Sequence, residues 1–120
     1  MKYLIKAKPR KEKKADLLSA IHRETLGLGS VAFGEYVKNM RQARELEDGT
    51  VCWIEVCFCK EPLNEERPYW GEYFSDIEIE EATSSDDCMD FNGIDKRACL
   101  GCDCTRGLEN EMLNWGVSFI

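Results

Sequence analysis

The sequence predicts an α+β fold, in which an open antiparallel sheet carries helices on one face. Segments around residues 2–8, 51–59 and 72–81 alternate apolar and polar residues, which is the pattern of half-buried strands. Segments within 11–30 and 31–49 repeat apolar residues at intervals of three and four, as amphipathic helices do. A chain of 120 residues with 43% hydrophobic residues suits one domain, and we expect residues 1–120 to form it.

The charge balance narrows the partners that the chain can bind. Its 23 acidic and 16 basic residues give a formal net charge of -7, which repels nucleic-acid phosphates and anionic lipid headgroups. We therefore expect neither a nucleic acid nor a membrane as a partner. The opening MKYLIK is shorter than the apolar core of a signal peptide, and no run of about 18 apolar residues is present to span a membrane. These observations predict a cytoplasmic protein, whose thiols are kept reduced.

The first half of the chain is expected to form one strand and two helices. In KYLIKAK, the residues Tyr3, Ile5 and Ala7 fall on one face of a strand that Pro9 ends. The first helix presents to the core the residues Leu17, Leu18, Ile21 and Thr25. The second helix presents the residues Phe33, Val37, Met40 and Ala43.

The strongest strand signal is TVCWIEVCFCK, in which alternation separates two faces. We assign to the core face the apolar residues Cys52, Ile54, Val56 and Phe58. The opposite face is the more polar one, because it includes the carboxylate of Glu55 beside Trp53, Cys57 and Cys59. Cys52 is therefore expected to be an ordinary buried thiol.

The remaining elements are expected to complete the sheet. In the run EYFSDIEIEEA, alternation assigns to the inner face of a strand the residues Tyr73, Ser75, Ile77 and Ile79. It should pair with residues 51–59 as an antiparallel hairpin with a long aromatic connection. We expect a polar, cysteine-rich loop at about 83–106 as an excursion from the domain. Compact domains seldom contain a loop of this length unless it has a function. A short helix in LENEML and an edge strand in GVSFI follow it.

This order of elements resembles the ferredoxin-like arrangement, with an extra helix in the first crossover. Proteins of that architecture often pair sheet to sheet. We therefore expect a homodimer, for which a dimeric α/β barrel is one arrangement. In this assignment Trp53 and Phe74 lie on the outer face of the sheet, and an exposed apolar patch marks a contact surface. The resemblance concerns the fold and carries no function with it.

The candidate functional residues are cysteines. The chain has seven, an odd number, so disulfides within the chain could not use them all. In CLGCDCTRG, the residues Cys99, Cys102 and Cys104 follow the pattern Cys-x-x-Cys-x-Cys, which lets three thiolates converge on one metal ion. The spacing therefore predicts a metal site in this segment.

The fourth ligand and the metal follow from ligand chemistry. Cys88 lies in the same loop and is our first choice, while Cys57 and Cys59 share a strand face and are the alternative ligands. Zinc suits a closed tetrahedral site of four thiolates, whereas an iron–sulfur cluster usually needs a more apolar pocket than this acidic loop offers. We expect zinc before an iron–sulfur cluster, and a chain without metal stays an alternative.

Two other functions stay open. A dithiol reductase or persulfide carrier would use the same cysteines at the start of a helix, where free amides stabilise a thiolate. A small enzyme of the ferredoxin-like class would use the open sheet face near Trp53, Glu55, Trp70 and Tyr73. The one histidine, His22, lies within the first helix, so the sequence assigns no catalytic residue and no small-molecule ligand.

Overall fold

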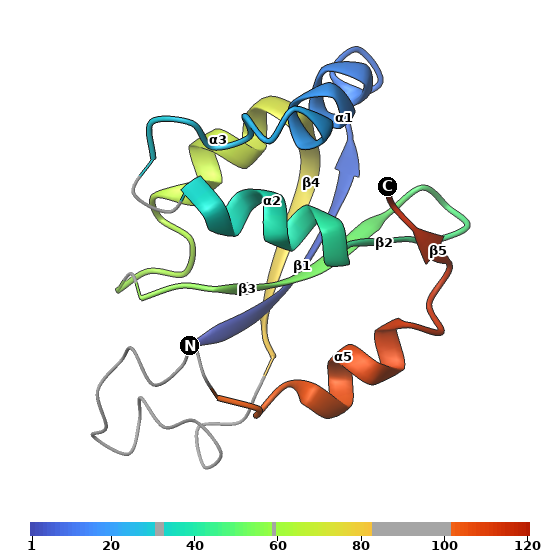
Figure 1. Cartoon of the computed structure of the whole chain (residues 1–120). Coiled ribbons are helices and arrows are strands. Elements are labelled where there is room, and N and C mark those ends of the chain that lie inside the picture. The colour runs from blue at the N-terminus through green and yellow to red at the C-terminus, as the bar shows by residue number, and fades with distance from the viewer. Residues whose placement is uncertain (31–32, 59, 83–101) are drawn as a thin grey trace.

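A five-stranded antiparallel sheet forms the centre of the α+β fold (Figure 1). The computed structural model describes residues 1–30, 33–58, 60–82 and 102–120. Its strands are β1 (Lys2–Pro9), β2 (Arg44–Glu45), β3 (Val51–Val56), β4 (Phe74–Glu81) and β5 (Val117–Ser118), in the spatial order β4-β1-β3-β2-β5. The expected strand at residues 2–8 is thus confirmed, and it is the central strand between β3 and β4.

Helices cover both faces of this sheet. One face carries α1 (Lys14–His22), α2 (Phe33–Gln42) and α3 (Glu66–Tyr73), and the other face carries α5 (Arg106–Met112) (Figure 1). We expected helices on one face only. The first two helices and the short helix near residues 108–113 were predicted, whereas α3 lies in a segment that we expected to be a loop. None of the helices in the described segments has the length and apolar character needed to cross a membrane.

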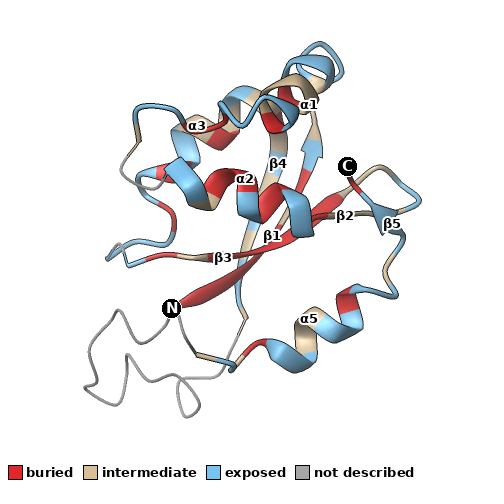
Figure 2. Cartoon of the chain, viewed as in Figure 1, coloured by how far each residue is buried: buried red, intermediate tan, exposed pale blue. Residues whose placement is uncertain are grey.

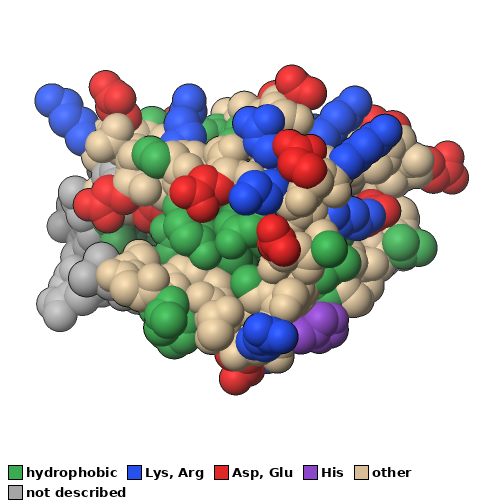
Figure 3. All heavy atoms as spheres, turned by 90° about the horizontal axis from the view of Figure 1, so that it is seen from above, with side chains coloured by type: hydrophobic (Ala, Val, Ile, Leu, Met, Phe, Trp, Pro, Cys, Tyr) green, Lys and Arg blue, Asp and Glu red, His purple; other side chains and the backbone are tan. Residues whose placement is uncertain are grey.

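The main core lies between the sheet and the layer formed by α1, α2 and α3. As predicted, Tyr3, Ile5 and Ala7 of β1 face this core, where they meet Leu17 and Ile21 of α1. Both β1 and β3 are buried along most of their length (Figure 2). Seen from above, the molecule shows a central hydrophobic strip bordered by charges of both signs (Figure 3). This side therefore presents no block of a single charge.

The two faces of β3 are the reverse of our assignment. Trp53 is fully buried in the main core with Val51 and Cys57, while Cys52 and Ile54 face α5. Phe58, which we expected in the core, is 38% exposed. The alternation was correct, but Glu55 did not mark a solvent-exposed face, because two indole groups satisfy its carboxylate inside the core.

The expected hairpin between β3 and β4 is wrong, because β1 lies between them. Ile5 of β1 is the register partner of Trp53 on one side and of Ile79 on the other. Phe74, which we placed on an outer face, is fully buried and packs against Trp53 with ring centroids 5.0 Å apart. The apolar surface that we proposed for a homodimer is therefore part of the core.

A bulge in β4 explains why its inward residues were only partly predicted. Lys6 pairs with Glu78 and Lys8 with Ser75, so two residues of β4 stand opposite Ala7. Asp76, within the bulge, has φ 53°. The extra residue brings Phe74 onto the same face as Ile77 and Ile79, whereas Tyr73 ends α3.

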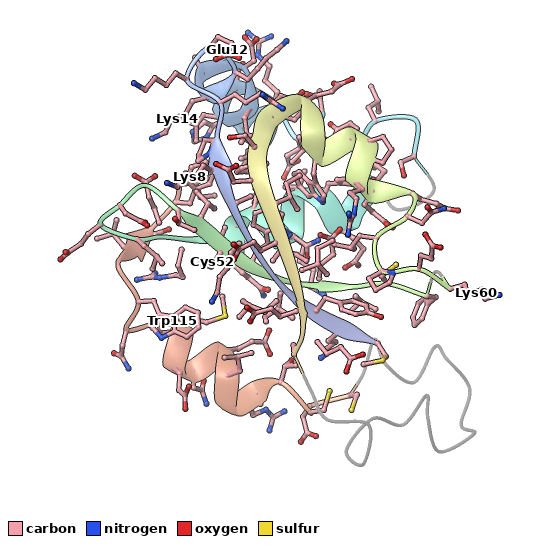
Figure 4. All side chains as sticks on the ribbon, turned by 180° about the vertical axis from the view of Figure 1, so that it is seen from behind. Lys8, Glu12, Lys14, Cys52, Lys60 and Trp115 are labelled. Carbon is pink, nitrogen blue, oxygen red and sulfur yellow. The ribbon has the colours of Figure 1, made fainter. Side chains whose placement is uncertain are left out.

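Helix α5 packs on the face of the sheet opposite the main core. Met112 of α5 joins a second buried cluster, the α5-side cluster, whose members are Leu4, Cys52, Ile54 and Met112. Trp115, just after α5, packs against this cluster and lies near Cys52 in Figure 4. The edge strand expected in GVSFI is confirmed as β5, which pairs with β2.

Candidate functional site

Cys102 and Cys104 lie directly before α5 and are both half-buried. Lys2, at the start of β1, is 8% exposed and its Nζ donates a hydrogen bond to the carbonyl oxygen of Cys102 at 2.6 Å. The Arg106 amide donates to the Asp103 carbonyl at 2.9 Å, which closes a turn around Cys104. The chain is therefore held in a defined turn at these two cysteines. Three other predicted ligands, Cys59, Cys88 and Cys99, lie outside the described residues.

Thr105 fixes the start of α5 beside these cysteines. Its side chain is buried, with 1% of the residue exposed, and its Oγ1 donates to Glu109 Oε2 at 3.2 Å. The Glu109 amide in turn donates to the Thr105 carbonyl at 2.8 Å. These bonds order the first turn of a helix that is too short to be stable by itself.

Cys57 lies at the end of the sheet where β1 begins. The Met1 ammonium donates to the Cys57 carbonyl, and the Cys57 amide donates to the Met1 carbonyl, each at 3.0 Å. The Cys57 thiol lies in the main core, where its Sγ accepts from the Leu63 amide at 3.3 Å and donates to Glu66 Oε2 at 3.8 Å. This thiol is 3% exposed and is part of the packing between β3 and α3.

The sheet separates Cys57 from the cysteines before α5. Lys2 reaches Cys102 from the α5 side, whereas the next residue, Tyr3, belongs to the main core together with Cys57. The structure thus does not bring Cys57 and Cys102 together. In the described part of the chain, no three His, Cys, Asp or Glu side chains gather closely enough to hold a metal ion. The site of four cysteines stays a prediction, since half of its members lie outside these residues.

Cys52 has the buried, apolar environment of a structural thiol. It is fully buried in the α5-side cluster, and burial raises the pKa of its thiol. A raised pKa keeps the group as a neutral thiol, which is neither a good nucleophile nor a ready metal ligand.

A buried carboxylate, Glu55, forms the second notable group. Trp53 Nε1 donates to Glu55 Oε2 at 2.9 Å, and Trp70 Nε1 donates to both oxygens, at 3.2 Å to Oε1 and 3.0 Å to Oε2. Glu55 is 4% exposed and the two indoles are buried almost completely. The sequence grouped Trp53, Glu55 and Trp70 correctly, but it expected them on an open face. Tyr73, the fourth member of that group, instead contacts Tyr69 at 5.8 Å between ring centroids.

The surroundings of Glu55 favour its neutral form. Burial, with a smaller contribution from the charges of Glu66 and Glu35, raises the pKa of this carboxyl to about 7, although the hydrogen bonds from the two indoles lower it. Among the described residues, the ion pairs do not include Glu55. Near neutral pH the protonated and ionised forms of this carboxyl are therefore close in free energy.

Aromatic rings enclose this carboxyl. Trp70 lies 5.1 Å from both Tyr36 of α2 and Trp53 of β3, measured between ring centroids. Tyr69 Oη accepts a hydrogen bond from the Gly27 amide at 2.7 Å, which ties α3 to the loop after α1. The aromatic cluster therefore joins the helix layer to the sheet around Glu55.

The sequence matches no protein-family model, and comparisons with curated proteins and with solved structures also found no match. The function must therefore be inferred from the residues of this chain.

Proposed function

We propose that this protein binds one zinc ion through Cys99, Cys102, Cys104 and Cys88, and that the metal stabilises the segment that leads into α5. The observation that carries the proposal is the turn at Cys102 and Cys104, which are adjacent to α5 and half-buried. Structural zinc sites are typically built on cysteines that lie close together in sequence, as these two do. The biological role beyond metal binding is unassigned.

The packing of α5 supports a stabilising role for a metal. This helix has seven residues, and Met112 is its one fully buried side chain among the described contacts. Isolated helices of this length are unstable in water, so α5 depends on what anchors its two ends. The binding free energy of a structural zinc ion adds directly to folding where its ligands lie.

The charge of Lys2 supports the same site. Four thiolates around Zn²⁺ carry a net charge near -2, and a cation nearby offsets it. The Lys2 ammonium is 2.6 Å from the Cys102 carbonyl oxygen and therefore lies beside the proposed ligands.

The strand order supports a ferredoxin-like arrangement. The first four strands lie in the order β4-β1-β3-β2, and β1 and β2 flank β3 on either side as antiparallel neighbours. The chain reaches β2 through α1 and α2, and reaches β4 through α3. In this interpretation α5 and β5 are additions to that arrangement. A homodimer stays a prediction to which no surface is assigned.

Metal analysis tests the proposal. Protein purified under reducing conditions should contain one zinc per chain, and the Co²⁺-substituted form should show the absorption of a tetrahedral thiolate site. Cys102→Ser should lower the metal content, whereas Cys52→Ala should retain it, because Cys52 is buried on β3. A parent protein without stoichiometric metal would remove the proposal, and iron with acid-labile sulfide would replace zinc by a cluster.

A second candidate is an acid–base enzyme that uses Glu55. It is favoured by the pKa of about 7, which suits proton transfer near neutral pH. Substrate would have to displace Trp53 or Trp70, because both oxygens of Glu55 accept hydrogen bonds from buried indoles. Glu55→Gln would abolish turnover of any substrate that this site converts, while metal binding would be unchanged.

A further inference from the structure

A cavity lies between the end of α2, α5 and the face of β3 that α5 covers. Its volume is about 280 Å³, near the lower limit of small-molecule sites, which begin at roughly 300 Å³. The lining is apolar where it meets the sheet and α5, with Ile54 8% exposed and Met112 4% exposed. Leu113 borders the cavity and is 66% exposed. An apolar ligand would cover this side chain.

Arg44 lies at the cavity with part of its guanidinium already fixed. Its Nε donates to the Trp115 carbonyl at 3.1 Å, and one Nη donates to the carbonyls of Leu113 and Gly116 at 3.2 and 3.4 Å. Within the described residues, the second Nη enters no such bond, although a guanidinium has five N–H donors. The carbonyls after α5 thus hold Arg44 rigidly while donors remain for a ligand.

The charges around the cavity favour one negative charge. Two arginines, Arg41 and Arg44, and one carboxylate, Glu109, border it, so the lining has one positive charge in excess. Glu109 already accepts from the Thr105 hydroxyl. Arg41 pairs with Glu24 at 2.5 Å, but the two side chains are 54% and 63% exposed, and such a pair contributes little. Arg41 can therefore turn toward a ligand at small cost.

We propose that this cavity binds a small organic monocarboxylate with an apolar body. The carboxylate would accept hydrogen bonds from the second Nη of Arg44 and from the guanidinium of Arg41, because hydrogen bonds between two ionised groups are short and strong. The apolar body would lie on Ile54 and Met112 and cover Leu113. The ligand bridges α2 and α5, so that binding stabilises the contact between the C-terminal elements and the sheet. This proposal is independent of the metal site.

Titration calorimetry and amide chemical shifts of the full chain, as purified under reducing conditions, provide the test, with 4-methylpentanoate as the probe. The carboxylate should bind and shift amides of residues 41–44 and 109–113. The neutral 4-methylpentanamide and inorganic phosphate should bind at least tenfold more weakly, because the first lacks the charge and the second lacks the apolar body. Equal binding of the amide would refute the role of the arginines, and equal binding of phosphate would refute the role of the apolar floor.

Variants of α2 and its ion-pair partner make the test specific. Arg41→Met should weaken binding of 4-methylpentanoate at least tenfold, because it removes a charged donor from the cavity. Lys38→Met, one turn earlier on α2, removes the same charge outside the cavity and should not change the affinity. Glu24→Gln breaks the Arg41 ion pair but keeps the arginine, and it should maintain or tighten binding. Absence of binding at millimolar probe, or equal losses in Arg41→Met and Lys38→Met, would overturn the proposal.

Discussion

Replacement of Glu55 by Gln should remove a defined pH dependence from the stability of the protein. The folded chain raises the pKa of this carboxyl from 4.5 to about 7. Between these two values the folded state keeps the proton that the unfolded state has lost. Stability is therefore highest below about pH 4.5, falls as pH rises toward 7, and is constant above that for this group.

The size of the effect follows from the same shift. One pKa unit corresponds to about 1.4 kcal/mol, so the rise from 4.5 to about 7 corresponds to about 3 kcal/mol. Because Glu55 is 4% exposed, solvent screens this effect little. Gln is a neutral isostere, and its carbonyl oxygen can accept from Trp53 and Trp70 as the protonated acid does.

Urea unfolding, followed by tryptophan fluorescence between pH 4.5 and 8, measures the difference. The free energy of unfolding of the parent should fall by about 3 kcal/mol more than that of Glu55→Gln across this range. Glu72→Gln, at an exposed position of α3, is the matched control and should keep the parental slope. Parallel pH profiles of the parent and Glu55→Gln would refute the reasoning.

The other predictions concern the C-terminal elements and the buried thiol. Gly116→Ala should cost more than about 1 kcal/mol of unfolding free energy in urea, because its Cβ would lie 2.0 Å from the Glu45 carbonyl oxygen at a φ of 48°. Gly107→Ala, with open space around its Cβ in α5, should be neutral or stabilising. Arg44→Met should lower the local stability of α5 and β5 by about 2 kcal/mol, because the carbonyls of Leu113, Trp115 and Gly116 lose their hydrogen-bond donor. Hydrogen exchange in these two elements should become faster. Cys52→Ala should cost about 1 kcal/mol by urea unfolding and leave metal content unchanged.

These outcomes can each fail in a recognisable way. Equal stability of Gly116→Ala and Gly107→Ala would mean that β5 does not pack against Glu45 as described. Unchanged exchange of α5 in Arg44→Met would show that the helix is anchored by other contacts. A loss of metal from Cys52→Ala would contradict the assignment of Cys52 as a structural thiol.

Local patterns predicted most of the helices and strands. The periodicity around Leu17 and Ile21 located α1, and alternation located β1 and β3 to within a few residues. Alternation cannot decide which face is buried, however, when both faces are covered. In β3 the choice rested on Glu55, and its two indole partners are 2 and 15 positions away in sequence. The pairing of β1 with β3 and β4 depends on contacts distant in the chain, which no local window contains.

The candidate site was predicted unevenly for the same reason. The spacing of Cys102 and Cys104 is local, and the structure holds both at the start of α5. Arg44 was not singled out, because its importance comes from carbonyls near residue 115 that fold against it. A signal was nevertheless present, since Arg41 and Arg44 are three positions apart in an acidic chain, the first at the end of an amphipathic helix and the second just after it.

The central position of β1 has a consequence for synthesis on the ribosome. This strand leaves the exit tunnel before either of its neighbours, because its register partners run from Lys2 to Val56 and from Tyr3 to Glu81. Both of its edges therefore stay without partners until most of the chain has been translated, and closing such distant contacts is slow. During that interval an apolar strand with two open edges is the segment most prone to pair with another chain. Conditions that slow elongation after residue 56 would prolong this exposure, and residues 2–9 would then be a binding site for a chaperone that recognises extended apolar segments.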